Sequence, residues 1–304
     1  MDGILAVWKP EGWTSHDVVA KVRRLLKMKR IGHTGTLDPM VTGVLPLCLG
    51  RATRVVEYVQ ERPKAYEAVL QLGVATDTED LTGTIIEQQS VHSITEKAVR
   101  EVLERFQGEI EQVPPMYSAV KVDGKRLYEL AREGKTVERK SRKVTIHDIE
   151  LLNAKLDQEK PTITFTVNCS KGTYIRTLCV DIGKALGVPA AMAHLTRTMS
   201  GGITKESCLT LDQIEQLQKD GNLEGHLIAA DEAISHLERA VVPTSVGRLA
   251  LLGQKISLTQ GHMHGSDKHD GQLVRLYNED HSFLGIFQID TTAAIFRAVK
   301  VFSA

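Results

Sequence analysis

The pattern of apolar residues changes at Pro243, and this change limits the folds open to the chain more than any other feature. Before Pro243, segments with the period of a strand alternate with segments with the period of a helix. After it, short strand-like runs are separated by glycines. No motif repeats at a fixed period. At 304 residues the length suits two domains. We therefore expect an α+β domain over residues 1–242 and a small, strand-rich domain over residues 243–304.

Several segments of the first domain have a clear period. Ser15, taken as an N-cap, precedes an apolar stripe from Val18 to Leu26 and predicts an amphipathic helix. The acidic stretch 211–237 is expected to form two more helices. Alternation predicts strands at 64–73 and 84–88 and a pair at 144–152 and 162–168, and helical spacing predicts helices at 94–106, 126–133 and 175–186.

The composition excludes several classes of protein. Hydrophobic residues make up 42% and charged residues 25%, as in an ordinary folded soluble protein. No apolar run reaches the roughly 18 residues needed to span a bilayer, and the N-terminus lacks a signal peptide's pattern. The four cysteines form no CxxC pair, so neither a disulfide framework nor a structural zinc site is indicated. We expect a cytoplasmic protein.

The charges balance in total, at 38 basic and 38 acidic residues, but they are separated along the chain. Residues 21–30 hold six basic residues and no acidic one, and residues 121–143 hold nine basic and four acidic residues, a net charge of +5. Residues 211–239 hold two basic and seven acidic residues, a net charge of −5. One basic run alone is typical of a solvated helix face. The two together favour a nucleic acid lying along them, away from the acidic segment.

A glycine-rich segment, 32–50, lies between apolar stretches and indicates a constrained loop. In one interpretation it is a structural turn in which Asp38 caps the backbone beside Pro39. A phosphate-binding loop is weakly indicated, since GxxxxGK[ST] and GxGxxG are both absent. In a third interpretation Asp38 is a nucleophile or base held by the loop, with His33 nearby.

Arg176 lies one turn inside the predicted helix that follows CSKGTY. It could be a surface arginine, but its side of the helix is otherwise apolar, which favours partial burial. A buried arginine needs an anionic partner, and Asp38 is the candidate. An arginine beside Asp38 would keep that carboxylate ionised and ready to attack.

Six segments resemble the bacterial tRNA pseudouridine-55 synthases, the pseudouridine synthase B family. They cover most of residues 1 to about 205 in the family's order: WKPEGWTSHDVV, GHTGTLDPMVTGVLPLCLGRATR, LQLGVATDTEDLTG, QVPPMYSAVKVDGKRLYELAREG, CSKGTYIRTLCVDIGKALG and AHLTRTMSGG. The resemblance implies a mixed, mainly antiparallel sheet with flanking helices, followed by a PUA-like β-barrel that binds RNA.

The resemblance also implies three catalytic residues. Asp38 in GHTGTLDP corresponds to the family's catalytic aspartate, and Arg176 in KGTYIR to the arginine that pairs with it. Tyr66 in KAYEAVL resembles the tyrosine that packs on the target base and takes part in proton removal. Without the motif, Tyr66 would be interpreted as a core tyrosine on a strand.

Five further residues match family positions that bind the substrate. His33 resembles the residue that fills the space left when the RNA loop opens, although alone it could equally brace its own loop. Leu195 matches an apolar residue that lines the uracil pocket; by itself it would be interpreted as core. Arg54 falls where relatives carry a basic residue that faces RNA, often a lysine. Lys9 in WKPEGW and Arg126 in GKRLYEL are expected to contact RNA as well.

The implied activity is isomerisation of uridine 55 to pseudouridine in the T-loop of tRNA, on a flipped base. The aspartate could attack C6 of the ring or C1′ of the sugar, or help to remove a sugar proton. No redox change occurs, so no cofactor or metal is expected. The expected partner is the T-arm of tRNA, bound by a monomer with no membrane and no obligatory protein partner. The insertion 121–143 is expected to be flexible until RNA binds.

Two other functions are compatible with the sequence. One is a tRNA-folding chaperone in which modification is secondary. The other is a guide-dependent synthase acting on ribosomal RNA, which the lack of long charged tails disfavours. The last polar cluster is interpreted as a solvated loop and not as a metal site: His262, His264, Asp267, His269 and Asp270.

Overall fold

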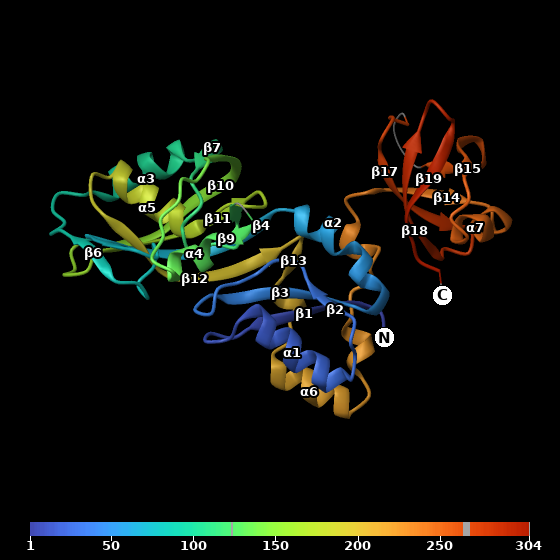
Figure 1. The fold of residues 1–304 in the computed structure, drawn as a ribbon, viewed down its shortest axis with the longest axis horizontal. Helices are drawn as coiled ribbons and strands as arrows, with labels where there is room; N and C mark the ends of the chain where they lie inside the picture. Colours follow the sequence, from blue (N-terminus) through green and yellow to red (C-terminus); the bar gives the residue numbers. More distant parts are fainter. Residues whose placement is uncertain (123, 264–267, 304) are drawn as a thin grey trace.

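The described residues form two large sheets, which Figure 1 shows at opposite ends of the molecule, and two small two-stranded ones. The computed structural model describes residues 1–122, 124–263 and 268–303. The larger sheet has nine strands in the order β1-β3-β12-β4-β11-β10-β7, with β2 added to β3 and β13 to β12. Its strands are β1 (Gly3–Lys9), β2 (Ile31–His33), β3 (Thr42–Leu49), β4 (Lys64–Leu72), β7 (Gly108–Gln112), β10 (Arg142–Lys155), β11 (Thr162–Cys169), β12 (Ala190–Ser200) and β13 (Ile203–Thr204).

Neighbouring strands of this sheet are antiparallel except β3 and β12, which pair in parallel. The expected mixed, mainly antiparallel sheet is therefore confirmed. The strand pair β10 and β11, read from alternation, is present and pairs along its length. A separate hairpin of β5 (Val74–Thr76) and β6 (Ile85–Gln88) extends from the end of β4.

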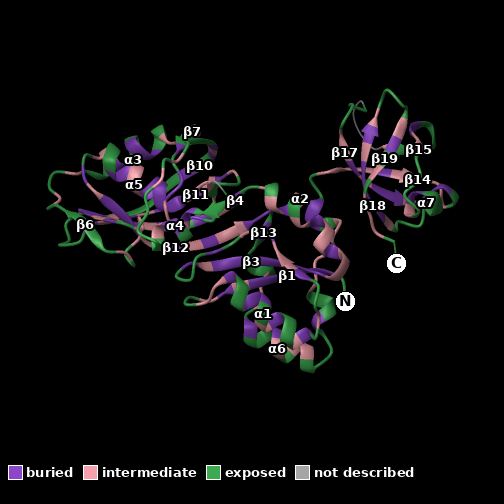
Figure 2. Ribbon diagram, viewed as in Figure 1, coloured by how far each residue is buried: buried purple, intermediate pink, exposed green. Residues whose placement is uncertain are grey.

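Helices cover both ends of the large sheet (Figure 1). At one end lie α1 (Ser15–Leu26) and α6 (Leu211–Lys219), and at the other α3 (Glu96–Arg105) and α5 (Ile175–Ala185). The short segments η1 (Gly50–Val55) and α2 (Val56–Glu61) connect β3 to β4. Figure 2 shows that the strands between these helices are largely buried, and one apolar cluster runs through them from Leu5 to Leu223.

The N-cap of α1 is Thr14, one residue before the predicted cap. The hydroxyl of Thr14 accepts a hydrogen bond from Asp17 N, and Asp17 Oδ2 accepts one from Thr14 N, which completes a capping box. The Ser15 side chain therefore does not cap the helix. Its buried hydroxyl lies against the segment that carries Asp38.

The acidic stretch after Leu211 forms one α-helix, not the two that were predicted. The rest of this stretch, residues 220–237, contains two short turns of 3₁₀-helix, η3 (Leu223–His226) and η4 (Glu232–Ile234). Gly221, with φ of 73°, ends α6, and Gly225 interrupts the period soon afterwards.

The acidic helix α6 also lies beside the basic helix α1, and Lys21 Nζ is 3.1 Å from Glu215 Oε2. The expectation that the acidic segment lies away from residues 21–30 is therefore wrong. Opposite charges on two amphipathic helices attract each other where the apolar faces pack, so part of the basic run is neutralised within the protein.

The smaller sheet has six strands in the order β15-β19-β18-β17-β14-β16. It curls into a half-barrel, consistent with the expected PUA-like fold (Figure 1). The strands are β14 (Glu238–Val242), β15 (Ile256–Ser257), β16 (His262–Met263), β17 (Leu273–Asn278), β18 (Phe283–Asp290) and β19 (Ile295–Val301). Because β14 pairs with β17, this sheet begins before Pro243, where the division was expected.

Pro243 starts a helix that the strand-rich pattern did not predict. Helix α7 (Thr244–Leu251) buries Val246 and Ala250 against the smaller sheet, and the turn η5 (Leu258–Gln260) follows it. Proline suits the start of a helix because its missing N–H would have no partner there. With eight residues, α7 is too short for its apolar residues to show a clear helical period.

The smaller sheet is joined to the segment before it through Arg275 of β17. The Arg275 guanidinium donates to the carbonyl oxygens of Leu237 at 2.9 Å, Asp231 at 3.2 Å and Ser235 at 3.5 Å. Beside it, Tyr277 Oη donates to Asp231 Oδ2 at 2.7 Å. These bonds fix the smaller sheet to the end of the first domain.

Many residues of the insertion between β7 and β10 are exposed, but its helix buries Leu127 and Leu130. It contains β8 (Lys121–Val122), β9 (Lys125–Arg126) and α4 (Leu127–Arg132), where a helix was predicted. Arg139 Nη1 donates to Pro114 O at 3.0 Å and so joins its two ends. Along the chain, η2 (Lys205–Ser207) follows β13. None of the helices described is long and apolar enough to cross a membrane.

Candidate active site

Asp38 and Arg176 meet, as the sequence predicted. Asp38 lies in the loop between β2 and β3, and Arg176 lies in the first turn of α5. The distance from Arg176 Nη2 to Asp38 Oδ2 is 3.1 Å. The arginine side chain is 9% exposed and the aspartate side chain 50% exposed. The carboxylate is thus anchored on its inner side and open to an incoming substrate on the other.

Arg176 has three further partners that the sequence did not reveal. Its Nη1 donates to Thr78 O at 2.9 Å, and its Nη2 donates to Tyr117 O at 2.8 Å. Asp80 Oδ2 lies 3.9 Å from Nη1. A guanidinium held on several sides cannot rotate away from Asp38 without losing charge-assisted hydrogen bonds.

The turn that presents Thr78 and Asp80 is tightly cross-bonded. Asp80 Oδ1 accepts from Thr78 Oγ1 at 2.8 Å and from Thr82 N at 3.0 Å. At Gly83 a side chain would have its Cβ only 2.3 Å from Asp77 Oδ1, so a glycine is required there. This rigid turn sets the position of Arg176.

Gln112 fixes the start of α5, which carries Arg176. Its carboxamide is buried and pairs with the backbone of Tyr174, with Nε2 donating to Tyr174 O at 3.2 Å and Oε1 accepting from Tyr174 N at 2.9 Å. The amide of Gln112 thus replaces a strand partner at the N-cap of the helix. Gln112 belongs to the segment QVPPMYS, but nothing in the sequence distinguishes it from a surface glutamine.

The backbone around Asp38 is fixed on both sides. Ser15 Oγ accepts from Leu37 N at 2.8 Å and lies 3.3 Å from Leu37 O. The carbonyl of Asp38 accepts from Val41 N at 3.0 Å. Pro39 O accepts from Gly12 N at 2.9 Å. The side chain of Asp38 therefore projects from a backbone with little freedom.

Lys9 belongs to the same support. It is fully buried, and its Nζ donates to Pro10 O at 2.8 Å and to Pro39 O at 3.1 Å. Burial lowers the pKa of this lysine to about 8, against the opposing attraction of Asp38. The expected direct contact between Lys9 and RNA is wrong, because the ammonium group is enclosed beneath the loop.

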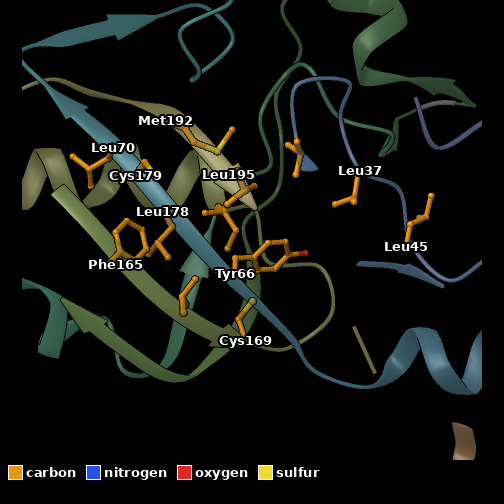
Figure 3. Packing of buried hydrophobic residues seen from close by; sticks show 14 of the residues in the cluster. Leu37, Leu45, Tyr66, Leu70, Phe165, Cys169, Leu178, Cys179, Met192 and Leu195 are labelled. Carbon is orange, nitrogen blue, oxygen red and sulfur yellow. The ribbon is translucent and has the colours of Figure 1, made fainter. Parts of the chain in front are cut away.

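Tyr66 and Leu195 form an apolar wall beside this loop. Tyr66 of β4 is 8% exposed and Leu195 of β12 is 7% exposed. Figure 3 shows the two side chains next to each other, with the Tyr66 hydroxyl pointing toward the side where Leu37 lies. Burial raises the pKa of Tyr66, while the charge of Arg197 partly opposes this. The tyrosine stays neutral at physiological pH.

His33 lies on β2 within the glycine-rich segment. Its Nδ1 accepts from Gly35 N at 3.3 Å, and its ring meets the His16 ring edge-on with centroids 5.6 Å apart. Burial lowers its pKa, as do the charges of His16 and Arg197. The hydrogen bond agrees with the interpretation that His33 braces its own loop.

Arg54 and Arg126 lie outside this group. Arg54 is in η1, beyond the last residue of β3, whereas the Asp38 loop precedes the first residue of that strand. Seven residue steps of a strand separate the two ends by roughly 23 Å. Arg126 is exposed on the insertion, where its Nη1 donates to Tyr128 Oη at 2.8 Å. In the described part of the chain neither forms a salt bridge with Asp38, and their contact with RNA stays a prediction.

The polar cluster of the second domain is only partly described. His264 and Asp267 lie outside the described residues. Asp270 Oδ1 accepts from Thr291 N at 2.9 Å and from Thr291 Oγ1 at 3.1 Å. These bonds bring two loops of the smaller sheet together.

Two solved structures share this fold over 99% of the chain. One is an H/ACA RNP bound to a substrate RNA containing 2′-deoxyuridine, at 26% identity, a TM-score of 0.77 and 85% coverage of that chain. The other is a Cbf5-Nop10-Gar1 complex, at 28% identity, a TM-score of 0.77 and 84% coverage of that chain. The chain therefore shares its overall fold with a protein from an RNP that binds a substrate RNA.

The family follows from sequence comparison. Residues 23–175 match the TruB family pseudouridylate synthase (N terminal domain), and residues 176–243 match the tRNA pseudouridylate synthase B C-terminal domain. The chain belongs to the TruB family. It is 45% identical over 289 residues to the tRNA pseudouridine synthase B of Bacillus subtilis, covering 94% of this chain and 93% of the relative. The corresponding protein of Bacillus pumilus is 50% identical over 241 residues, covering 79% and 78%.

Proposed function

We propose that the chain converts uridine 55 in the T-loop of tRNA to pseudouridine. The N1–C1′ bond breaks, the uracil turns within the pocket, and a C5–C1′ bond forms. C5 then loses its proton and N1 gains one, so the product is an isomer of the substrate and no electrons are exchanged. Membership of the TruB family and the relatives' shared name support tRNA as substrate. The six motifs support position 55.

The pair of Asp38 and Arg176 is the observation that carries this proposal. Here the carboxylate is half-exposed and held by a buried guanidinium at 3.1 Å, so its free oxygen faces the substrate side in a fixed orientation. Such positioning favours nucleophilic attack, since the carboxylate needs no search for the right geometry.

The apolar wall of Tyr66 and Leu195 suits a flipped base. A uracil inside an RNA stack cannot reach Asp38, so the enzyme must turn it out at a cost of a few kcal/mol. An aromatic ring and a leucine side by side offer contact to the faces of the base. In this arrangement the Tyr66 hydroxyl lies on the side of the Asp38 loop, where it would take part in proton removal.

The insertion supplies the contact to the RNA around the target. It carries exposed basic residues, including Arg126 and Arg132, on both sides of Tyr128. Basic groups on phosphates hold an RNA without reading its sequence. We propose that the insertion closes on the T-arm and that one copy of the chain suffices.

The test measures tritium released from tRNA labelled at uracil C5, and from an isolated T-arm stem-loop with the same label. Wild-type protein is expected to release the label from both substrates, and Asp38→Asn from neither. A stem-loop with cytidine at position 55 and tritiated uracil elsewhere controls for position. Release from that control at the wild-type rate would contradict the proposal for position 55.

A guide-dependent synthase is the second candidate, because the similar solved structures are of an RNP with a substrate RNA and of a Cbf5-Nop10-Gar1 complex. Activity of the chain alone on the stem-loop would favour a synthase that acts by itself over a guide-dependent one. A chaperone role is tested by refolding of unmodified tRNA with wild type and with Asp38→Asn. If both accelerate refolding equally while only wild type releases tritium, the chain has both activities.

A further inference from the structure

Arg197 of β12 is the largest fully buried side chain among the described residues, at 1% exposure. A charge removed from water is costly unless it is paired or fully hydrogen-bonded. No carboxylate in the described part of the chain forms a salt bridge with it. A positive charge is therefore kept in the core at a position where leucine or methionine would pack at lower cost.

The contacts of Arg197 explain its presence. Its Nη2 donates to Gly35 O at 3.1 Å and its Nη1 to Thr36 O at 3.5 Å, before Asp38. Its Nε donates to Val44 O at 2.8 Å, after Asp38. One planar group thus ties the two ends of the loop that carries Asp38. A lysine has a single nitrogen and could not reach both ends in this way.

The backbone is shaped to admit this group. Arg197 pairs with Gly43 where β12 meets β3, at the one parallel junction of the large sheet. A Cβ on Gly43 would lie 2.2 Å from Arg197 O, and Gly43 has φ of 114°. The glycine allows the two strands to approach closely, and the guanidinium then passes under the loop.

Arg197 also faces Tyr66. The two residues are directly opposite each other in the antiparallel pair of β12 and β4, so their side chains lie on the same face. The wall of the base pocket and the loop of the aspartate therefore meet at one guanidinium. With Lys9 holding Pro39 O, two buried cations support the segment 35–39 from inside.

We propose that Arg197 is a positioning residue for the isomerisation: it sets the place of Asp38 relative to Tyr66 and holds a positive charge behind both. This rests on the proposed function. According to the proposal, Arg197 increases the rate of the chemical step as well as stabilising the fold. The charge lies behind the carboxylate, so Arg197 acts through the loop and does not touch the substrate.

The experiment compares Arg197→Lys with Arg275→Lys. Arg275 is the matched control, since its guanidinium also holds main-chain carbonyls but lies in the smaller sheet. Both variants are expected to have a lower thermal midpoint. Only Arg197→Lys should slow single-turnover tritium release at saturating enzyme, by about 10²-fold, because a displacement of roughly 1 Å has that effect on a positioned group. The Kd for tRNA should stay within about threefold of wild type.

Chemical rescue gives a second, independent measurement. In Arg197→Ala, added methylguanidinium should restore single-turnover release in a saturable manner, whereas methylammonium, with the same charge but no fork, should not. Neither compound should restore Asp38→Asn. If Arg197→Ala does not fold, the single-turnover rate of Arg197→Lys alone tests the proposal.

Three results separate the outcomes. An Arg197→Lys rate within about twofold of wild type would overturn the proposal. Equal slowing in Arg197→Lys and Arg275→Lys would also overturn it, because general destabilisation would then explain the loss. A wild-type protein that releases no tritium at all would instead refute the proposed function, whatever the Arg197 variants do.

Discussion

The Arg176 guanidinium joins Asp38 to the insertion between β7 and β10 through one nitrogen atom. Nη2 lies 3.1 Å from Asp38 Oδ2 and 2.8 Å from Tyr117 O, which is in the segment leading into the insertion. The position of the carboxylate therefore depends on the backbone at Tyr117 as well as on α5. If the insertion closes on RNA as proposed, a shift of the backbone at Tyr117 would move Arg176 and, with it, the carboxylate of Asp38.

Replacing Arg176 by lysine should slow the reaction without abolishing RNA binding. A lysine keeps the charge but cannot hold Thr78 O, Tyr117 O and Asp38 together, so the carboxylate loses its fixed orientation. We expect single-turnover tritium release to fall by about 10²-fold with Kd for tRNA nearly unchanged. If Arg176→Lys reacts at the wild-type rate, a positive charge beside Asp38 is sufficient and the fork of the guanidinium is not required.

Tyr66→Phe separates the ring of Tyr66 from its hydroxyl. If the hydroxyl takes part in proton removal, this variant should lose about 10²-fold or more in rate and keep its affinity for tRNA. Tyr66→Leu removes the ring as well and should also weaken substrate binding, by about 1–3 kcal/mol if the ring stacks on the base. Equal rates for wild type and Tyr66→Phe in single-turnover assays would limit the role of Tyr66 to packing.

The strands and helices that carry the site were largely predictable from the sequence. Alternation in residues 64–73 predicted the strand that carries Tyr66, and the apolar side of the α5 helix indicated that Arg176 is buried. The strand β12 was not predicted from the sequence. In it Leu195 and Arg197 lie two residues apart on one inward face, so the buried position of Arg197 became visible only in the structure.

Contacts between distant segments were not predictable. Asp80 reaches Arg176 only because the hairpin of β5 and β6 folds back against β12, where Leu81 N donates to Met192 O at 3.1 Å. Lys9 resembles a surface lysine in sequence, yet the loop at Pro39 closes over it. Local propensity carries no information on which loop covers which side chain.

The salt dependence of tRNA binding should reflect the insertion more than α1. Arg126 and Arg132 are exposed. If both contact phosphates, replacing both by glutamine should make the plot of log binding constant against log salt concentration less steep, by about two in slope. Lys21→Gln should change the slope less, because Lys21 is already paired with Glu215. Binding measured over a range of salt concentrations tests both. An equal change for Lys21→Gln would show that the pair opens when tRNA binds.

The buried ammonium of Lys9 should make stability depend on pH in a defined window. In the folded protein the pKa of Lys9 is about 8, whereas an unfolded chain has the ordinary value of about 10.4. Between these values the unfolded state binds more protons, so the free energy of unfolding gains from Lys9 as pH rises, by at most about 1.4 kcal/mol per pH unit. Below pH 8 both states are protonated and the contribution is constant.

Lys9→Met has no amino group at this position, so comparing it with wild type measures the contribution of Lys9 titration to stability. Urea unfolding of wild type and of Lys9→Met at several pH values from about 7 to 10 should give curves of stability that run parallel up to about pH 8 and then diverge, with wild type gaining. Lys97→Met, on the exposed face of α3, is the control and should stay parallel to wild type throughout. Parallel curves for Lys9→Met as well would mean that the ammonium keeps its proton beneath the loop, because the bonds to Pro10 O and Pro39 O outweigh the cost of burying the charge.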